Sequence, residues 1–260
     1  MSLNENKIKR YLGDKYAYLP IIVDKITDST NTRAKVLGDS ALCKRAVLIA
    51  EEQTKGRGRL GRSFVSNGGK GLYLSILLGD EMPASFATSL TTYMAVIASH
   101  AIDSLTGMNT EIKWVNDIYA GSKKLAGILT EGKASGKGET LAYAVIGIGI
   151  NVLKQDFPED VKLIATTIED ECAEVPDINR LAALVIEDFL DNLDKVGSRE
   201  IADEYKSRSF LIGKKITVTK PTESYEALVT DITRKCELVL RLHSGQTEVL
   251  STGEVSVKPV

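Results

Sequence analysis

The sequence predicts an α/β (α+β) protein in which a mixed central sheet is flanked by helices and followed by a small all-β unit. Apolar runs at residues 46–52, 72–79 and 141–152 have the length and the side chains of strands. Residues 83–105 and 178–193 repeat apolar side chains every three or four positions, which is typical of helices that pack on a sheet. These two patterns alternate along most of the chain, so a layered α/β domain is expected.

The remaining elements of this domain follow in order. Residues 19–26 predict a strand that runs into helix-capping side chains at residues 28–31, where a short helix should begin. A glycine-rich loop separates the next two strands. The first long helix is expected to begin at Pro83 and to end before Gly107. Two further strands are expected at residues 111–115 and 124–131, and a shorter helix is expected at residues 198–209.

After about residue 211 the sequence changes character. Short segments with roughly alternating apolar side chains are separated by polar turns, at residues 214–220, 225–232, 237–244 and 248–257. This pattern predicts a small all-β barrel. We therefore divide the chain into a main domain, residues 1–210, and a C-terminal β-barrel domain, residues 211–260.

Composition excludes several classes of protein. The chain has 260 residues, 43% of them hydrophobic, which suffices for a packed core. Its net charge of −2 excludes the overall basic field of a general nucleic-acid binder. No segment approaches the roughly 20 apolar residues of a membrane span, and the first residues lack a signal-peptide core, so we expect a cytoplasmic protein with no membrane partner. The three cysteines and two histidines show no metal-ligand spacing.

The most informative segment is the loop QTKGRGRLGR at residues 53–62. Between residues 53 and 79 the chain carries no acid but several basic side chains: Lys55, Arg57, Arg59, Arg62 and Lys70. Glycines let backbone N–H groups come close to an anion, and guanidinium groups bind phosphate or carboxylate through paired hydrogen bonds. The loop therefore indicates an anionic ligand, with a solvated basic loop as the alternative.

Context excludes other nucleotide-binding motifs. Gly56, Gly58 and Gly61 have the spacing G-x-G-x-x-G, but the following segment enters a strand and not the helix that a dinucleotide fold requires. The string G-x-x-x-x-G-K-[ST] of a P-loop is absent. A non-catalytic RNA-binding loop is disfavoured, because aromatic side chains do not alternate with the arginines.

The loop and its neighbours closely resemble the GRGRxGR signature of biotin protein ligases. Other segments support the same family in the same order: DSTN at 28–31, KWVND at 113–117, KLAGIL at 124–129, GIGIN at 147–151 and GEVS at 253–256. The family often has proline where this chain has Val115, a difference that removes no functional group. The resemblance covers about residues 20–260. It implies a class II synthetase-like ligase domain, residues 1–210, that binds biotin and ATP, and an SH3-like β-barrel, residues 211–260.

The resemblance implies an ATP-dependent enzyme, a biotin–[biotin carboxyl carrier protein] ligase. Such an enzyme forms biotinyl-5′-AMP and pyrophosphate from biotin and MgATP, then transfers biotin to a lysine of a biotin carboxyl carrier protein. The alternatives are a lipoate protein ligase and a non-catalytic biotin- or nucleotide-binding regulator. Fewer than 30 residues precede Ser29, too few for the helix-turn-helix of family members that are also repressors, so no specific DNA binding is expected. Whether the chain forms a homodimer stays open.

Residue roles follow from the resemblance, position by position. The biotin-binding set comprises Ser29, Thr30, Asn31, Gln53, Gly56, Arg57, Gly58, Arg59, Lys124, Gly127, Gly147 and Gly149. The ATP- or AMP-binding set comprises Arg59, Arg62, Phe64, Asn116, Asp117 and Asn151. Arg57, Arg59 and Lys124 would act in catalysis by holding the carboxylate and the α-phosphate together. No side-chain cluster for a metal is predicted, and Mg²⁺ would arrive with ATP, near Asp117.

These residue types suit the ligand, although each has a simpler structural alternative. Biotin carries a neutral ureido ring and a carboxylate, so its pocket needs hydroxyls and amides at one end and cations at the other. Taken singly, the residues have these alternatives: a helix cap (Ser29, Asn31), a solvated strand end (Lys124), close packing (Gly147, Gly149), turn residues (Asn116, Asp117, Asn151) or core (Phe64, Trp114).

Overall fold

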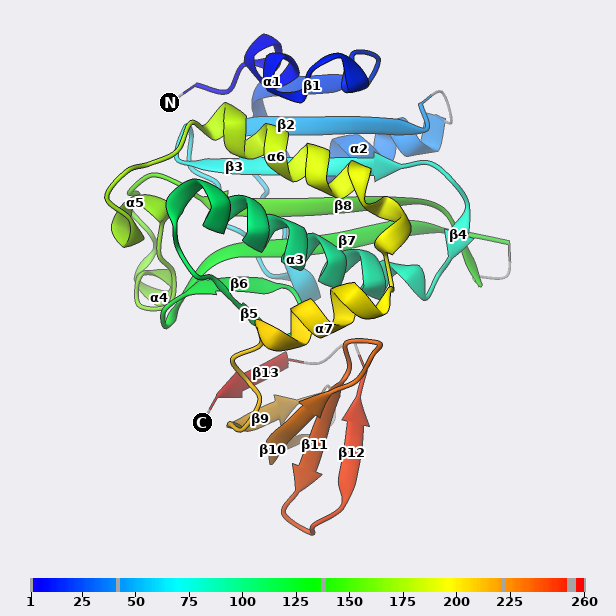
Figure 1. The fold of residues 1–260 in the computed structure, drawn as a ribbon, viewed down its shortest axis with the longest axis vertical. Coiled ribbons are helices and arrows are strands. Elements are labelled where there is room, and N and C mark those ends of the chain that lie inside the picture. Colours follow the sequence, from blue (N-terminus) through cyan, green and yellow to red (C-terminus); the bar gives the residue numbers. More distant parts are fainter. Residues whose placement is uncertain (1, 41–42, 137–138, 221–222, 252–255, 260) are drawn as a thin grey trace.

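A large mixed sheet with helices on both faces forms most of the protein, and a small antiparallel sheet lies below it in Figure 1. Helix α7 (Arg199–Ser207) lies between the two sheets. The α/β fold predicted from the sequence is confirmed. The structure is a computed structural model that describes residues 2–40, 43–136, 139–220, 223–251 and 256–259. None of the described helices has the length and apolar character needed to cross a bilayer.

The strands of the large sheet lie in the order β1-β2-β3-β8-β7-β6-β5, with β4 paired to β8. β1 and β2 are parallel, and the other neighbours are antiparallel. Helices cover both faces at β3, so every residue of that strand is buried. The strands are β1 (Ile21–Thr27), β2 (Arg45–Gln53), β3 (Gly71–Leu78), β4 (Met82–Pro83), β5 (Glu111–Lys113), β6 (Asp117–Ala120), β7 (Lys123–Ser135) and β8 (Thr140–Asn151).

Two groups of helices bury the two faces of this sheet. α3 (Phe86–Thr106) and α6 (Ile178–Asp191) pack together on the near face in Figure 1, over the main apolar core. α2 (Thr30–Ser40) covers the far face, where a second cluster gathers around Leu48 and Tyr143. Shorter elements complete the domain: α1 (Glu5–Leu12), η1 (Asp14–Tyr16), η2 (Arg59–Gly61), α4 (Glu159–Lys162), α5 (Ile168–Glu171) and η3 (Leu193–Lys195).

The small sheet contains five antiparallel strands in the order β12-β11-β10-β9-β13. The first three strands match expected segments, whereas the last expected segment, residues 248–257, is divided between β12 and β13. The strands are β9 (Lys215–Thr219), β10 (Ser224–Ile232), β11 (Leu238–Leu242), β12 (Thr247–Leu250) and β13 (Ser256–Pro259). Of the motif GEVS, residues 253–255 lie outside the described residues. The apolar core of this sheet is continuous with that of the main domain.

The turn between β5 and β6, residues 114–116, is bonded to both the small sheet and α7. Trp114 Nε1 donates a hydrogen bond of 2.8 Å to the carbonyl oxygen of Cys236, in the turn between β10 and β11. Tyr205 Oη, on α7, donates to the carbonyl oxygen of Val115 at 3.0 Å. Both aromatic side chains are buried. Because buried polar groups need partners, these bonds fix the turn from two sides.

The sequence did not predict the shortest elements. The strand expected at residues 111–115 ends at Lys113, and the turn that follows leads into β6. α1, β4, α4 and α5 were also missed. β4, α4 and α5 have two to four residues, too few to show a period of two or 3.6. α1 has eight residues, but only Ile8 and Leu12 of it are buried, so its apolar pattern is short.

We predict that Tyr205→Phe lowers the free energy of unfolding by about 1–3 kcal/mol, because the buried carbonyl of Val115 loses its donor. Urea denaturation measures this change. Tyr18→Phe is the matched control, since Tyr18 is 99% exposed, and it should leave the midpoint unchanged. Equal stability of Tyr205→Phe and the wild type would contradict the role given to this bond.

Candidate active site

The glycine- and arginine-rich loop after β2 folds back on itself as a narrow hairpin. Gly58 N donates to the carbonyl oxygen of Arg62 at 2.7 Å, and Phe64 N donates to that of Gly56 at 3.0 Å. A Cβ at Gly56 would lie 2.2 Å from the Phe64 carbonyl oxygen, so only glycine permits this approach. The hairpin carries its arginines across the edge of the large sheet near β6 and β7.

A first cavity, here called the neutral pocket, lies between α2, β7 and β8. Apart from Arg57, its wall consists of uncharged side chains and glycines. The lining residues are Ser29, Thr30, Asn31, Gln53, Arg57, Phe64, Gly127, Leu129, Gly147, Ile148 and Gly149. The pocket therefore offers hydroxyl and amide groups in a setting that is largely free of charge.

The polar groups of the neutral pocket form one hydrogen-bond network. Thr30 N and Oγ1 donate to Gln53 Oε1 at 2.9 and 3.2 Å. Gln53 Nε2 donates to Ser66 Oγ at 2.9 Å. Ser75 Oγ, fully buried on β3, lies 2.7 Å from both Thr30 Oγ1 and Asn31 Oδ1. Because each group is held by a partner, the pocket presents fixed donors and acceptors to a ligand.

Ser29 and Asn31 differ in their relation to α2. Ser29 precedes the helix, and its carbonyl oxygen accepts from Arg33 N at 3.1 Å, as at a cap position. Asn31 lies inside the helix, and its side chain crosses to β7. Asn31 Nδ2 donates to Leu129 O at 3.1 Å and to Glu131 Oε2 at 3.0 Å. The helix-cap alternative is therefore wrong for Asn31.

Gly147 and Gly149 make room for other protein groups. A Cβ at Gly147 would lie 2.0 Å from Asn31 Oδ1, and a Cβ at Gly149 would lie 2.5 Å from the ring of Phe64. What remains open in the neutral pocket is about 30 Å³, space for roughly two water molecules. A larger ligand must therefore displace the ring of Phe64.

A second cavity, the cation-lined pocket, shares Arg57, Phe64 and Gly127 with the neutral pocket. Basic side chains predominate in its wall, and Asp117 is the acid among the lining residues. These residues are Arg57, Gly58, Arg59, Leu60, Arg62, Ser63, Phe64, Lys113, Trp114, Asn116, Asp117, Lys124, Gly127 and Ile128. Such a wall attracts anions.

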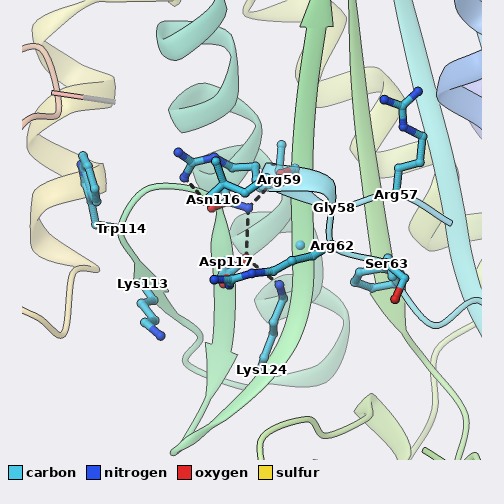
Figure 2. A pocket seen from close by; sticks show the side chains of 14 residues that line it. Arg57, Gly58, Arg59, Arg62, Ser63, Lys113, Trp114, Asn116, Asp117 and Lys124 are labelled. Atoms are coloured by element: carbon cyan, nitrogen blue, oxygen red, sulfur yellow. Dashed lines mark hydrogen bonds and ion pairs between the residues drawn. The ribbon is translucent and has the colours of Figure 1, made fainter. Parts of the chain in front are cut away.

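Asn116 and Asp117 hold two of these cations in place (Figure 2). Arg59 Nη1 donates to Asn116 Oδ1 at 3.2 Å, and Lys124 Nζ pairs with Asp117 Oδ1 at 2.7 Å. Asn116 Nδ2 donates in turn to Asp117 Oδ1 and to Ile128 O, at 3.1 and 3.0 Å. Burial lowers the pKa of the Arg59 guanidinium, and the nearby carboxylate of Asp117 opposes this shift. Arginine nevertheless remains charged in proteins, so Arg59 is a permanent cation.

Arg57 points away from Arg59 and Lys124 in Figure 2. Its Nη2 pairs with Glu131 Oε1 at 3.1 Å, and Lys35 Nζ pairs with the same oxygen at 2.9 Å. Burial raises the pKa of the Glu131 carboxyl, but hydrogen bonds from Asn31 and Lys35 and the charge of Arg57 together hold that pKa below its usual value. Glu131 thus connects the neutral pocket to the loop.

A third cavity, the outer pocket, extends from the cation-lined pocket toward the loop after β8. Its volume of about 570 Å³ exceeds that of the neutral pocket and of the cation-lined pocket. Asn151 Nδ2 donates to Thr166 O at 3.1 Å and so ties that loop to β8. The lining residues are Gly61, Arg62, Ser63, Phe64, Val65, Lys113, Asp117, Tyr119, Lys124, Asn151, Phe157, Asp160, Val161, Ile164 and Ala165.

Nearly all of the residues that the sequence predicted for the site line these three cavities. Gly56 lines none of them, and the tight hairpin explains why glycine is needed there. The sequence missed Leu129 and Ile148 in the neutral pocket, as well as Ser75 and Glu131 behind it. These four residues lie within strand segments whose pattern predicts only burial, so no local signal could have identified them.

Two carboxylates near these cavities are candidates to meet a magnesium ion. Among the described residues, no group of three or more His, Cys, Asp or Glu is placed to hold a metal ion. Asp117 and Asp160 line the outer pocket. Mg²⁺ that accompanies a nucleotide needs only one or two carboxylates besides phosphate and water, so these residues fit an ion that enters as MgATP.

The fold and the connected cavities define an α/β protein that can hold a neutral hydrogen-bonding group and an anion side by side. Residues 23–151 match the biotin/lipoate A/B protein ligase family, and residues 211–258 match the biotin protein ligase C terminal domain. The biotin--[acetyl-CoA-carboxylase] ligase of Mycobacterium tuberculosis is 30% identical over 90% of this chain and 88% of its own. The chain belongs to the biotin protein ligase family.

A second relative matches over about half of its length, and a solved structure matches over nearly all of its chain. The bifunctional ligase/repressor BirA of Bacillus spizizenii is 34% identical over 66% of this chain. The match spans only 53% of that relative, about half its length. A solved structure of biotin protein ligase from Aquifex aeolicus in complex with biotin and ATP has a TM-score of 0.79 and 28% identity, over 93% of this chain and 99% of its own.

We predict that Glu131→Gln removes a pH-dependent part of the stability. The folded-state pKa of Glu131 lies below the ordinary value of 4.5. Its contribution is therefore present above that pH and is lost as pH falls through the folded-state pKa. The difference in unfolding free energy between wild type and variant should be constant near neutral pH and should shrink below about pH 4.5. Urea denaturation over a pH series measures this difference in unfolding free energy, and Glu226→Gln, at an exposed position, is the control. A difference that does not depend on pH would contradict the lowered pKa of Glu131.

Proposed function

We propose that this chain is an ATP-dependent biotin protein ligase. It forms biotinyl-5′-AMP and pyrophosphate from biotin and MgATP, and then transfers biotin to a lysine of a biotin carboxyl carrier protein. The observation that carries the proposal is the junction of the neutral and cation-lined pockets at Phe64 and Gly127. An acid with a neutral head can lie in the first pocket while its carboxylate enters the second.

Biotin fits this division of the site. Its ureido group both donates and accepts hydrogen bonds, and the network around Thr30, Asn31 and Gln53 offers fixed groups of both kinds. The apolar part of biotin would lie against Leu129 and the glycines of β8, after the ring of Phe64 moves aside. Binding of biotin is thus coupled to movement of a residue on the hairpin.

The nucleotide would occupy the outer pocket, with its phosphates in the cation-lined pocket. The volume of about 570 Å³ in the outer pocket suits a nucleoside, whereas the neutral pocket is far smaller. Arg59, Arg62 and Lys124 then surround the α-phosphate. Asp117 and Asp160 are the carboxylates placed to meet the magnesium ion of MgATP.

The reaction needs no side-chain nucleophile. A carboxylate oxygen of biotin attacks the α-phosphorus, the bond to the β-phosphate oxygen breaks, and pyrophosphate leaves with the electron pair. Arg59 and Lys124 lower the repulsion between the two anions that must meet. The neutral ε-amine of the acceptor then attacks the carbonyl carbon, AMP leaves with the electrons of the C–O bond, and the amine proton passes to water.

The location of the protein is also part of the proposal. Because the substrate is ATP, we place the protein in the cytoplasm. The division at residue 210, the absence of specific DNA binding and a possible homodimer stay separate predictions. A gel shift on a defined operator and a sedimentation measurement would decide the last two.

We predict that Arg59→Ala lowers biotin-dependent pyrophosphate release by about 10²–10³-fold, because one preorganised cation is lost from the transition state. Release from MgATP is measured with biotin, with lipoate and with neither acid. Arg241→Ala, at an exposed position on β11, is the matched control and should behave as the wild type.

Each result has a distinct meaning. Release that depends on biotin and is lost in Arg59→Ala supports adenylation at this site. Release only with lipoate would transfer the chain to the lipoate branch of the family. Release with neither acid would refute the proposed function.

A further inference from the structure

A fourth cavity, here called the side arm, opens from the cation-lined pocket and is used by neither biotin nor ATP in the proposal above. It lies between the first turns of α3 and the middle of β7, next to the β5–β6 turn. Its lining residues are Arg59, Ala87, Thr88, Thr91, Val115, Ile128 and Thr130. It shares Arg59 and Ile128 with the cation-lined pocket, so the two cavities meet at the loop arginine.

The side arm and the neutral pocket lie on opposite faces of β7. Side chains alternate along a strand, and Gly127 and Leu129 line the neutral pocket while Ile128 and Thr130 line the side arm. The β6–β7 ladder ends at Gly127 in the part of the chain that the structure describes. Asn116 bonds both backbone groups of the next residue, because its carbonyl oxygen accepts from Ile128 N at 2.9 Å and its Nδ2 donates to Ile128 O at 3.0 Å. A group in the side arm would therefore reach the cation-lined pocket around the edge of β7 beyond Ile128, beside Arg59.

The size and the wall of the side arm suit a particular reactant. Its volume is about 210 Å³, against about 570 Å³ for the outer pocket, which is small for a nucleotide. It offers one cation and no amide side chain, unlike the pockets assigned to ATP and biotin. The five heavy atoms of a lysine side chain need roughly 75 Å³ at about 15 Å³ each, the volume that one water-sized group needs in a cavity measured in this way.

We propose that the side arm admits the acceptor lysine of the carrier protein and guides its amine to the adenylate. This inference rests on the proposed function and adds the route of the third reactant. The methyl groups of Thr88 and Thr130 and the side chain of Ile128 can contact the methylene stem. Thr91 Oγ1 lies 2.8 Å from Thr130 Oγ1 and 2.9 Å from the carbonyl oxygen of Ala87. Its one proton can serve either acceptor, and in both arrangements the Thr130 hydroxyl keeps a lone pair that can accept from the amine.

Arg59 gives the side arm a chemical function as well. A cation beside a lysine lowers the pKa of its ammonium group, and the neutral amine is the nucleophile. The amine lone pair attacks the biotinyl carbonyl carbon, the C–O bond to phosphate breaks, and AMP leaves with that electron pair. The amine proton passes to water. The same guanidinium would stabilise the negative charge on the departing phosphate.

The test separates the two half-reactions in the 260-residue chain. We predict that Ala87→Val, Ala87→Leu and Ala87→Phe, which fill the side arm step by step, slow biotin transfer to a purified biotin carboxyl carrier domain progressively. The loss should reach about 100-fold for Phe, equivalent to about 2.7 kcal/mol. Biotin-dependent pyrophosphate exchange should change by less than about twofold, and adenylate capture by hydroxylamine, a small nucleophile, should persist.

Two further variants test whether the effect comes from filling the side arm. Thr88→Leu fills the side arm from the next position and should reproduce the selective loss of transfer. Ser104→Phe adds the same bulk at an exposed position of α3 and should affect neither half-reaction.

Wild-type transfer by Ala87→Phe, with its fold verified by thermal unfolding, would overturn the proposal. Equal loss of exchange and transfer would also overturn it, because the arm would then serve biotin or ATP. If the wild type shows no biotin-dependent exchange, the proposed function fails first and the proposal fails with it.

Discussion

The candidate site depends on the hydrogen bonds of one amide, that of Asn116. Its oxygen accepts from Arg59, and its nitrogen donates to the backbone of β7 and to Asp117. An isolated loop rich in arginine and glycine would have many conformations and strong internal repulsion. Asn116 lowers the entropy cost of ordering the loop, because it fixes the Arg59 guanidinium against the sheet. It also lowers the repulsion between the cations, because it orients the Asp117 carboxylate that pairs with Lys124.

The same arrangement explains how a cluster of cations can exist before an anion binds. Lys124 is paired with Asp117, and Arg57 is paired with Glu131, on opposite sides of Gly127. These ion pairs offset part of the repulsion in the ligand-free state. An incoming carboxylate or phosphate must compete with Asp117 and Glu131 for the cations. The basic side chains therefore have negatively charged partners both with and without the ligand. Ligand binding only exchanges the carboxylates of Asp117 and Glu131 for those of the ligand or its phosphates.

The small C-terminal sheet contributes to this arrangement from outside the cavities. It holds Trp114 through the carbonyl of Cys236, while α7 holds Val115 through Tyr205. The next residue of that turn is Asn116, so buried bonds at the contact between the sheets set the position of Arg59. Burial raises the pKa of Tyr205 well above its usual value, so this donor keeps its proton throughout the physiological range.

The sequence by itself determined the order of the long elements, because the strands and helices of nine or more residues carry a clear apolar pattern. It also identified the motif residues, because glycine and arginine at fixed spacing have few other uses. It did not reveal the two-sided burial of β3, the partners Ser75 and Glu131, or Gly56 as a requirement of the hairpin. Only the tertiary structure decided these, since each depends on a contact between segments distant along the chain, such as Asn31 with Glu131. The same holds for the side arm, whose walls come from the loop, α3, the β5–β6 turn and β7, and no local pattern records that such segments meet.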